Sequence, residues 1–429
     1  MGQPPLRLGL AGLGTVGVGV IRMLRQNAQL IEARTGRSVV ISAVSARSKG
    51  KDRGVPLDSY AWEDDPVVLA TRDDVDVFVE LMGGSDGPAK AATQAALKAG
   101  KDVVTANKAM LAVNGQALAT QAETAGQVIR YEAAVAGGIP VVKALTEGLA
   151  GNEVTRVLGV MNGTCNYILT RMETAGLPYD TVFKEADDLG FLEADPNLDV
   201  GGIDAGHKLA ILASVAFGTQ VDFDNVTLEG IGSVTIDDIT AAKDMGYRIK
   251  LLGVAQMTGR GLEQRMTPCL VPYHSPLGQL EGGTNMVILE GEHSGQIVLR
   301  GAGAGEGPTA SAVLSDVLDL ARGLRLPTFG QPAENLVAAK STTSDAPAPH
   351  YIRIHLHDKP GALAKTAAIL GEAGVSINRM RQYGHDDPTA QVLIVTHKTS
   401  GSTIKTVRQQ LADSSVTDGQ PVILRIEEI

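Results

Sequence analysis

The chain is poor in cysteine and in aromatic residues, and it lacks a long apolar run. With only Cys165 and Cys269 among 429 residues, a disulfide framework is excluded and a reducing compartment is favoured. A membrane span needs roughly 20 consecutive apolar residues, and none is present. The N-terminal apolar stretch runs directly into a glycine-rich turn, unlike a signal peptide. We therefore expect a cytoplasmic protein without membrane contact.

Positive charge is also in deficit, with a formal net charge of -10. This balance argues against a nucleic-acid partner, although it leaves room for a local basic site that holds a phosphorylated small molecule. Aromatic residues make up 3% and apolar residues 44%, so the cores are expected to be aliphatic. The length predicts two or three domains.

Short apolar runs alternate with helical patterns over residues 1–135, which predicts a doubly wound parallel sheet of the Rossmann type. We expect a dinucleotide-binding domain there, to which residues 301–335 return. Longer helices and scattered strands over 136–300 predict an α+β substrate and dimerisation domain. The expected strands of the first domain include the runs LRLGLAG, VVISAVSA, VDVFVEL, DVVTANK and VIRYEAAV.

Residues 341–349 have the composition of a linker, and the following 80 residues form a separate unit. In residues 350–429 the strand and helix patterns follow the order β-α-β-β-α-β. That order is typical of a ferredoxin-like fold.

A G-x-G-x-x-G motif follows the first expected strand, made by Gly12, Gly14 and Gly17 with Thr15 and Val16 between the last two. The three glycines suit a tight turn, close approach of a pyrophosphate, and close packing of helix on strand. The pyrophosphate would bind at a helix N-terminus. The alternative is a glycine-rich packing turn.

The second expected strand ends at Ser45 and is followed by Arg47 and Lys49, where an NAD enzyme usually carries an acidic residue. Cations and hydroxyls suit a 2′-phosphate, so NADP is favoured over NAD. A solvated basic loop is the alternative.

The segment from Gly190 to Lys208 concentrates charged residues. Asp204 and Lys208 are four residues apart and share one face of an expected helix. Glu193 and Asp199 lie just upstream in an expected loop. Carboxylates beside a lysine suit a substrate that carries an ammonium group and a reacting hydroxyl. A surface ion pair with solvated acids is the alternative, because such pairs are common.

The run 187–209 resembles the homoserine dehydrogenase signature G-[FY]-x-E-x-D-P-x-x-D-x-x-G-x-D-x-x-x-K. The segments 105–108, 162–164 and 303–309 are also similar to that family, and the resemblance spans residues 1 to about 335. Phe191 lacks the hydroxyl of the Tyr that some members carry, and Gly206 stands where a slightly larger residue is usual; neither difference affects the charged residues.

The resemblance implies the NAD(P)-dependent interconversion of L-homoserine and L-aspartate 4-semialdehyde in threonine and methionine biosynthesis. It implies that Lys208 transfers the proton, that Lys108 is its electrostatic partner and also contacts the cofactor, and that Asp204 orients Lys208. Which lysine transfers the proton stays open. Burial beside another cation lowers the pKa of a lysine from its ordinary value of about 10.4 toward a useful range.

The resemblance also implies binding roles for further residues. Glu193 and Asp199 would hold the substrate ammonium, the N–H groups around Gly163 and Thr164 its carboxylate, and Gly305 would contact the cofactor. A monovalent cation such as sodium would be bound by Glu132 and by the backbone of Val135, Gly137 and Ile139.

Two rival functions remain open. Cys165 stands before an expected helix, where a thiol would be acidic enough for the acylating chemistry of semialdehyde dehydrogenases. A non-enzymatic amino-acid sensor with an inactive Rossmann domain is the other rival. Cys269 shows no partner motif, so we expect it to be a small apolar core residue.

The segment DKPGALAKTAAILGEAGVSIN resembles the ACT domain, a small-molecule sensor that often pairs across subunits. The resemblance places an effector near Asp358, Gly361, Ala362 and Asn378, and pathway logic favours L-threonine. We expect a homodimer or homotetramer. A purely structural dimerisation module is the alternative.

Overall fold

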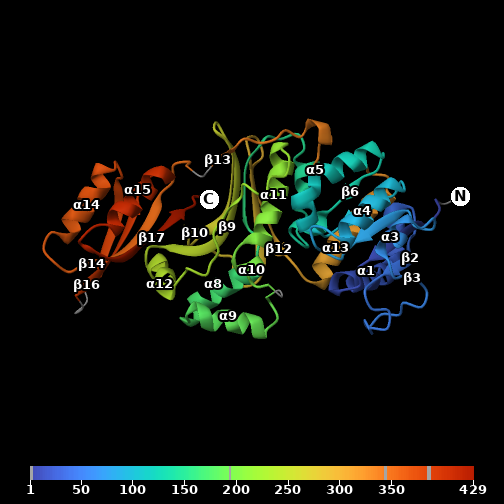
Figure 1. Ribbon diagram of the computed structural model, residues 1–429, viewed down its shortest axis with the longest axis horizontal. Coiled ribbons are helices and arrows are strands. Elements are labelled where there is room, and N and C mark those ends of the chain that lie inside the picture. Colours follow the sequence, from blue (N-terminus) through green and yellow to red (C-terminus); the bar gives the residue numbers. More distant parts are fainter. Residues whose placement is uncertain (1–2, 193–194, 343–344, 384–387) are drawn as a thin grey trace.

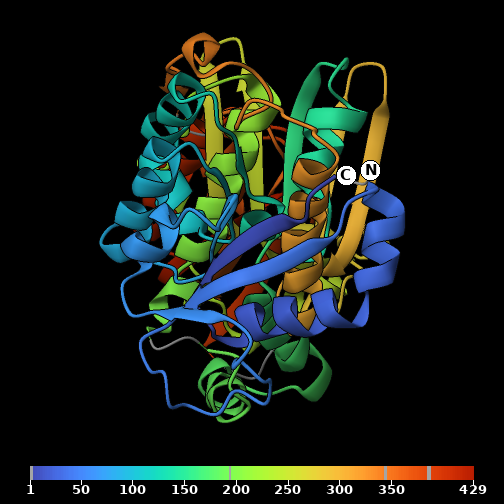
Figure 2. The same ribbon diagram turned by 90° about the vertical axis from the view of Figure 1, so that its right-hand side faces the viewer.

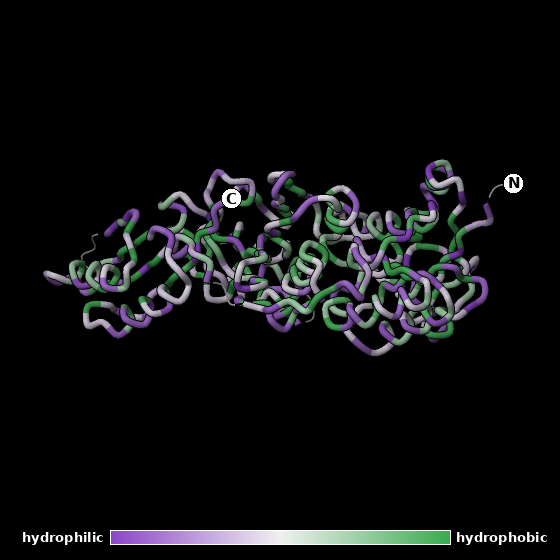
Figure 3. Tube along the Cα trace, turned by 90° about the horizontal axis from the view of Figure 1, so that it is seen from above, coloured by the Kyte–Doolittle hydropathy of each residue, from purple (hydrophilic) through white to green (hydrophobic). Residues whose placement is uncertain are grey.

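The computed structural model describes residues 3–192, 195–342, 345–383 and 388–429. Three parts follow one another along the longest axis, from the N-terminal part in blue to the C-terminal part in red (Figure 1). Seen from above, the molecule is long and narrow, and its apolar segments gather inside each part (Figure 3). No helix of the described chain is long and apolar enough to cross a membrane.

The N-terminal part is a six-stranded parallel sheet with the strand order β3-β2-β1-β4-β5-β6, the order of a Rossmann fold. The strands are β1 (Leu6–Ala11), β2 (Val39–Ser45), β3 (Ala61–Glu63), β4 (Val77–Glu80), β5 (Asp102–Thr105) and β6 (Ile129–Arg130). The expected doubly wound sheet is therefore confirmed.

Helices cover both faces of this sheet. One face carries α1 (Thr15–Gln26), α2 (Ala28–Thr35) and α13 (Glu306–Ala321), and the other carries α3 (Pro66–Thr71), α4 (Pro88–Lys98) and α5 (Lys108–Thr124). Helix α13, orange in Figure 2, returns from the far end of the sequence and packs on α1, where a Cβ on Gly19 would lie 3.1 Å from the Cβ of Ala310. Chain segments almost 300 residues apart thus build one core.

One expected strand of this part is mostly wrong. In the run VIRYEAAV only Ile129 and Arg130 pair in the sheet, and Glu132–Val135 form the short helix α6. The backbone N–H of Glu132 donates to Asp316 of α13 at 2.7 Å. Asp316 therefore takes the hydrogen bond that a neighbouring strand would otherwise accept from Glu132. Because Asp316 lies far along the chain, the run VIRYEAAV alone gives no sign of this partner.

The middle part is built on a mixed sheet, as expected. Its strands follow the order β12-β11-β7-β9-β10, and the helices α8, α11 and α12 pack against them. The strands are β7 (Val154–Val160), β8 (Thr227–Leu228), β9 (Tyr247–Thr258), β10 (Gly261–Pro272), β11 (Thr284–Gly291) and β12 (Gly295–Ala302). The helices are α7 (Val141–Lys143), α8 (Gly163–Ala175), α9 (Tyr179–Asp188), α10 (Asn197–Val200), α11 (Ile203–Phe217) and α12 (Ile236–Asp244), with a π-helical turn over Ala144–Gly148.

The C-terminal part has the expected β-α-β-β-α-β order, and its sheet continues the middle sheet. Its elements are β14 (His350–His357), α14 (Ala362–Glu372), β15 (Ile377–Tyr383), β16 (Thr389–Thr396), α15 (Gly401–Ala412) and β17 (Thr417–Ile426). Strand β17 pairs with β14 on one side and with β10 on the other. In the segment predicted as a linker, β13 (Ser341–Thr342) also pairs with β10.

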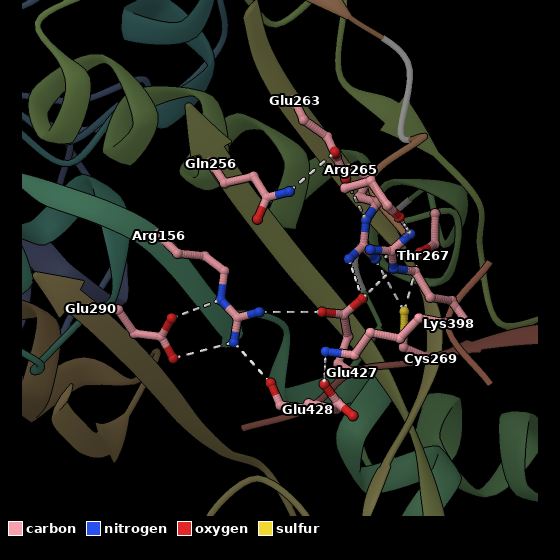
Figure 4. Close-up of polar contacts among 12 residues, drawn as sticks. Arg156, Gln256, Glu263, Arg265, Thr267, Cys269, Glu290, Lys398, Glu427 and Glu428 are labelled. Carbon is pink, nitrogen blue, oxygen red and sulfur yellow. Dashed lines mark hydrogen bonds and ion pairs between the residues drawn. The ribbon is translucent and has the colours of Figure 1, made fainter. Parts of the chain in front are cut away.

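A cluster of buried charges joins β17 to the middle sheet (Figure 4). Glu427 forms ion pairs with Arg265 of β10, with Arg425 of β17 and with Arg156 of β7. Arg265 also donates to the sulfur of Cys269 at 3.3 Å. Cys269 is buried in an apolar core cluster, as expected, and its sulfur also meets the Arg265 guanidinium, a contact that the sequence did not indicate.

Candidate active site

A cavity of about 680 Å³ lies between the N-terminal sheet and the middle part. Its walls come from the carboxyl ends of β4 and β5, where an open α/β sheet binds ligands, and from α8, α10 and α11. The residues predicted for catalysis and binding that line it are Val16, Lys108, Val135, Gly163, Thr164, Asp199, Asp204, Lys208 and Gly305.

The glycine motif has the shape that a dinucleotide needs. Gly12 has φ +100°, and a Cβ on it would lie 2.4 Å from the carbonyl oxygen of Leu81. A Cβ on Gly17 would lie 2.0 Å from the oxygen of Gly12, so helix and strand pack closely there. Gly14, in contrast, has open space around it, and α1 begins at Thr15 without a side-chain cap. Free N–H groups beside open space fit a pyrophosphate.

The basic residues after β2 follow the carboxyl end of that strand, the same edge of the sheet at which the glycine motif follows β1. Arg47 and Lys49 are exposed, and the Lys49 amine lies 5.9 Å from the ring centre of Trp62. Sequence reasoning missed Arg53, which donates to the carbonyl oxygen of Leu13 at 3.1 Å and to that of Ser48 at 2.7 Å. Its only signal is a positive charge eight residues beyond the strand end, too common a feature to single it out.

The carboxylate of Asp204 binds both predicted lysines. Asp204 lies in the first turn of α11, its Oδ2 is 2.6 Å from Nζ of Lys208 one turn later, and its Oδ1 is 2.7 Å from Nζ of Lys108. Lys108 is the first residue of α5, in the other half of the cavity. One buried carboxylate thus ties the cofactor-binding half to the substrate-binding half.

The positive charges of Lys208 and Lys108 stabilise the ionised carboxylate of Asp204. Burial acts to raise the pKa of Asp204, but Lys208 and Lys108 outweigh burial and hold that pKa well below its ordinary value. Lys208 is buried and also donates to the carbonyl oxygen of Met161 at 3.0 Å, so two acceptors fix its amine. Lys108 is about one third exposed and faces the cavity.

The expected substrate-binding residues in the described part of the chain line the same cavity as Asp204 and Lys208. Asp199 is buried in the short helix α10 rather than in a loop, and it accepts a hydrogen bond from the Asn162 amide at 2.9 Å. Asn162 caps α8 by accepting from the N–H of Cys165. The N–H groups of Gly163 and Thr164 open α8 on the cavity side. Glu193 lies outside the described residues.

The thiol of Cys165 is not fit for nucleophilic attack. It is fully buried and donates to the carbonyl oxygen of Asp199 at 3.3 Å. Burial, and then the nearby carboxylates of Asp199 and Asp204, raise the pKa of this thiol well above its ordinary value. The expected activation by the helix N-terminus was wrong, because desolvation and two acids dominate.

A buried acid that sequence reasoning missed shapes the cofactor side. Glu80 ends β4 and is fully buried; it accepts from the Thr105 hydroxyl at 2.6 Å and from the backbone N–H groups of Met82 and Gly83. These bonds fix the turn that lines the cavity. The signal was a lone charge at the end of an apolar strand run.

The side chain of Glu132 already has partners. Its carboxylate accepts from the N–H groups of Val142 at 2.9 Å and Lys143 at 2.8 Å. Burial and the neighbouring Asp316 raise its pKa to about 7. These two bonds fix the carboxylate and leave lone pairs on both of its oxygens, so the cation site expected at Glu132, Val135, Gly137 and Ile139 stays a prediction.

The predicted effector residues divide into two groups. Asp358 and Gly361 precede α14, near the strand pair His357↔Thr389, whereas Asn378 lies by the pairs at Val395 and Thr396. Six residues of β16 separate these places, roughly 20 Å at about 3.3 Å per residue. Ala362 is buried as the first residue of α14. Within one chain these residues do not form a single site.

Comparison with known proteins agrees with this geometry. Residues 140–318 match the homoserine dehydrogenase family, residues 12–132 the homoserine dehydrogenase NAD binding domain, and residues 350–414 the ACT domain. The chain is 41% identical to a homoserine dehydrogenase of Neisseria gonorrhoeae over 99% of each chain, and 38% identical to one of Bacillus subtilis over 98% of each.

Solved structures are similar over the whole chain. A homoserine dehydrogenase from Thiobacillus denitrificans superimposes with a TM-score of 0.94 at 35% identity and covers 100% of both chains. A hyperthermophilic archaeal homoserine dehydrogenase in complex with NADPH gives 0.65 at 25% identity, over 76% of this chain and 99% of its own. The acylating and sensor-only alternatives find no support. This chain, an oxidoreductase with an NAD-binding Rossmann domain and a C-terminal ACT domain, belongs to the homoserine dehydrogenase family.

Proposed function

We propose that Lys208 transfers the proton in the interconversion of L-homoserine and L-aspartate 4-semialdehyde, and that Lys108 supports it electrostatically. The observation that carries the proposal is the single carboxylate of Asp204 between two lysine amines inside the cavity. Lys208 is the more buried of the two, and its amine is fixed by Asp204 and by the Met161 carbonyl.

The chemistry needs one hydride and one proton to move. The nicotinamide, when bound, accepts the hydride from the carbon that bears the hydroxyl. In oxidation the unprotonated amine of Lys208 takes the hydroxyl proton; in reduction the protonated amine gives it to the developing alkoxide. Lys108 stabilises negative charge on the same oxygen. Asp199 holds the substrate ammonium, and the opening N–H groups of α8 hold its carboxylate.

A steady-state assay tests this proposal. Purified protein incubated with L-homoserine and either NADP or NAD should form the reduced cofactor, followed by absorbance. With L-aspartate 4-semialdehyde and oxidised cofactor in place of L-homoserine, added inorganic phosphate should cause no reduction of the cofactor, as it would with an acylating enzyme that uses Cys165. Activity that depends on phosphate and is lost on alkylation of a thiol would contradict the proposal.

The cofactor is proposed to be NADP, because Arg47 and Lys49 stand beyond β2 where an acid is usual. Arg47→Ala should raise KM for NADP about tenfold, the effect of losing one hydrogen bond to a charged group, with little change for NAD. Arg53→Ala should weaken both cofactors, because Arg53 holds the Leu13 carbonyl of the glycine loop.

Arg34→Ala is the matched control, since Arg34 is an exposed arginine on α2. It should leave both cofactors unchanged. Equal effects of Arg47→Ala on NADP and NAD, or a preference of the unmodified enzyme for NAD by kcat/KM, would show that the 2′-phosphate site is misassigned.

L-threonine is proposed as the feedback effector of the ACT domain. The N-cap of α14 is Gly361, which has no side chain to cap the helix, so among the described residues the first-turn N–H groups after that of Ala362 remain for an amino-acid carboxylate. Because Asn378 lies at the opposite end of the strands, one ligand meets both groups only if a second copy of the chain supplies one of them. An effector acts by binding one arrangement of the enzyme better than another.

The full-length enzyme should lose activity as L-threonine is added. Asp358→Ala and Asn378→Ala should each raise the half-inhibitory concentration at least tenfold while kcat stays unchanged, because the loss of a charged or polar contact costs about 1.5–3 kcal/mol. Asp413→Ala, at the end of α15, is the control and should behave as the unmodified enzyme. Indifference to threonine, lysine, methionine and isoleucine alike would leave the domain a structural module.

A further inference from the structure

Asn285 lies where the two halves of the cavity meet. It is near the start of β11, it is one of the residues that line the cavity, and it is 2% exposed. A Cβ on Gly303 would lie 1.9 Å from its Nδ2, and a Cβ on Gly163 would lie 3.4 Å from its Oδ1. The amide therefore touches the turn that returns to α13 and the first residue of α8 at once.

The Oδ1 atom of Asn285 is buried without a hydrogen-bond partner among the residues that the structure describes. Two other buried asparagines nearby are satisfied at both ends. The Asn162 amide joins Asp199 to the N–H of Cys165, and the Asn166 amide joins the Gly282 carbonyl to the amine of Lys250. A buried carbonyl oxygen without a donor is unfavourable, so Asn285 is suited to a partner that arrives with a ligand.

The chemistry of that partner follows from the amide. A primary amide offers an acceptor and a donor side by side, and its complement is a group that offers a donor and an acceptor at the same spacing. The substrate carboxylate only accepts hydrogen bonds. The substrate ammonium only donates, and carboxylates are proposed to hold it. The substrate hydroxyl does both, but through one oxygen atom, and it is proposed to lie at Lys208. The carboxamide on the nicotinamide ring does both.

We propose that Asn285 pairs with the carboxamide of the nicotinamide, accepting an N–H at Oδ1 and donating from Nδ2 to the carboxamide oxygen. This assignment rests on the proposed function and on the expected contact of Gly305, in the turn that returns to α13, with the cofactor. The pair fixes the rotation of the ring, so that one ring face meets the substrate held at Asp204 and Lys208. Asn285 is therefore a cofactor-positioning residue on the substrate side of the cavity.

The test compares the binding of three ligands, with no turnover. They are NADP, its 3-acetylpyridine analogue, which keeps the carbonyl but lacks the N–H, and 2′-phospho-ADP-ribose, which lacks the nicotinamide. Trp62 is the only tryptophan and lies beside Lys49 and Arg53, so its fluorescence reports binding at the common end of all three. The unmodified enzyme should bind the acetyl analogue about tenfold more weakly than NADP, the effect of one lost hydrogen bond.

Asn285→Ala should weaken NADP about tenfold or more, leave 2′-phospho-ADP-ribose unchanged, and bind NADP and the acetyl analogue alike. Asn166→Ala is the matched control, because Asn166 is an equally buried amide whose partners all belong to the protein. It should keep the full discrimination between NADP and the analogue, whatever stability it loses.

Three results would overturn the proposal. In the unmodified enzyme alone, equal affinity for NADP and the acetyl analogue would do so even if Asn285→Ala failed to fold. Equal weakening of all three ligands in Asn285→Ala would show a packing role. An increase in KM for homoserine with unchanged cofactor binding would assign Oδ1 to the substrate ammonium. ADP-ribose, compared with its 2′-phosphate, tests the NADP preference separately, so failure of one proposal is distinguishable from failure of the other.

Discussion

Lys208→Ala is expected to lower kcat by roughly 10²- to 10⁴-fold, the usual contribution of a positioned acid or base. The amine of Lys208 lies 2.6 Å from Asp204 and 3.0 Å from the Met161 carbonyl, so it is held in one place in the cavity. Without it, Lys108 still pairs with Asp204, and the cofactor loop is untouched. Cofactor affinity should therefore stay nearly unchanged while turnover is lost.

Lys250→Met provides the matched control for that variant. Lys250 is also a buried lysine whose amine donates to a backbone carbonyl, that of Leu280, but it does not line the cavity. It should change stability more than kcat. A folded Lys208→Ala protein that keeps more than a tenth of the activity would remove Lys208 from the proton-transfer role, and a larger loss in Lys108→Ala would give that role to Lys108.

The features that the sequence predicted are those fixed by local spacing. Asp204 and Lys208 are one helical turn apart, so their contact follows from the periodicity once the helix is recognised. The glycine motif was predictable for the same reason, because its turn, its open side and its packing contact all fall within six residues.

The features that the sequence could not supply depend on contacts between distant segments. The family resemblance placed Lys108 beside Lys208, but the contact of Lys108 with Asp204, almost one hundred residues away, has no local signal. Asn285 reaches Gly163 across more than one hundred residues. Nothing in the run around Asn285 differs from an ordinary strand start. Likewise, the activation expected for Cys165 follows from its place at a helix start, whereas the acids that help to raise its pKa, Asp199 and Asp204, belong to α10 and α11, which the run NGTCN does not contain.

Continuity of the sheet between the middle and C-terminal parts was equally unpredictable. The composition of 341–349 is that of a linker, yet β13 pairs with β10, and Arg260 forms an ion pair with Asp345 at 2.8 Å. Strands β10 and β17 are joined at only two residue pairs, Cys269↔Arg425 and Leu270↔Ile426. Two ladder positions give no sequence signal. Apolar residues such as Tyr351 and Ile426 share one core cluster with the middle part, and the buried charges of Glu427 and Arg265 lie beside them.

Glu427→Gln is expected to weaken that junction strongly. Glu427 and Arg265 each have side chains only 4% exposed, and Arg425 and Arg156 approach the same carboxylate. Removing one partner of a buried ion pair costs about 3–5 kcal/mol, because the remaining charge stays in a poorly solvated place. In the Glu427→Gln protein, Glu263, at 3.2 Å, would be the one carboxylate in the described part of the chain that still forms an ion pair with Arg265. The loss should appear as a lower midpoint of thermal unfolding by calorimetry and as faster proteolysis within 341–349.

Glu428→Gln is the control, one residue along the chain. Its ion pair with Lys398 joins side chains that are 61% and 60% exposed, and exposed pairs contribute only about 0–1 kcal/mol. The stability of the junction should also decrease as the pH is lowered. Burial acts to raise the pKa of Glu427, but Arg265 and Arg425 outweigh it and lower that pKa, so the stabilisation is present above the ordinary pKa of a glutamate and is lost as the pH falls below it. If Glu427→Gln and Glu428→Gln unfolded at the same temperature, at neutral pH and at pH 4 alike, the charge cluster would not contribute to holding the C-terminal part on the middle sheet.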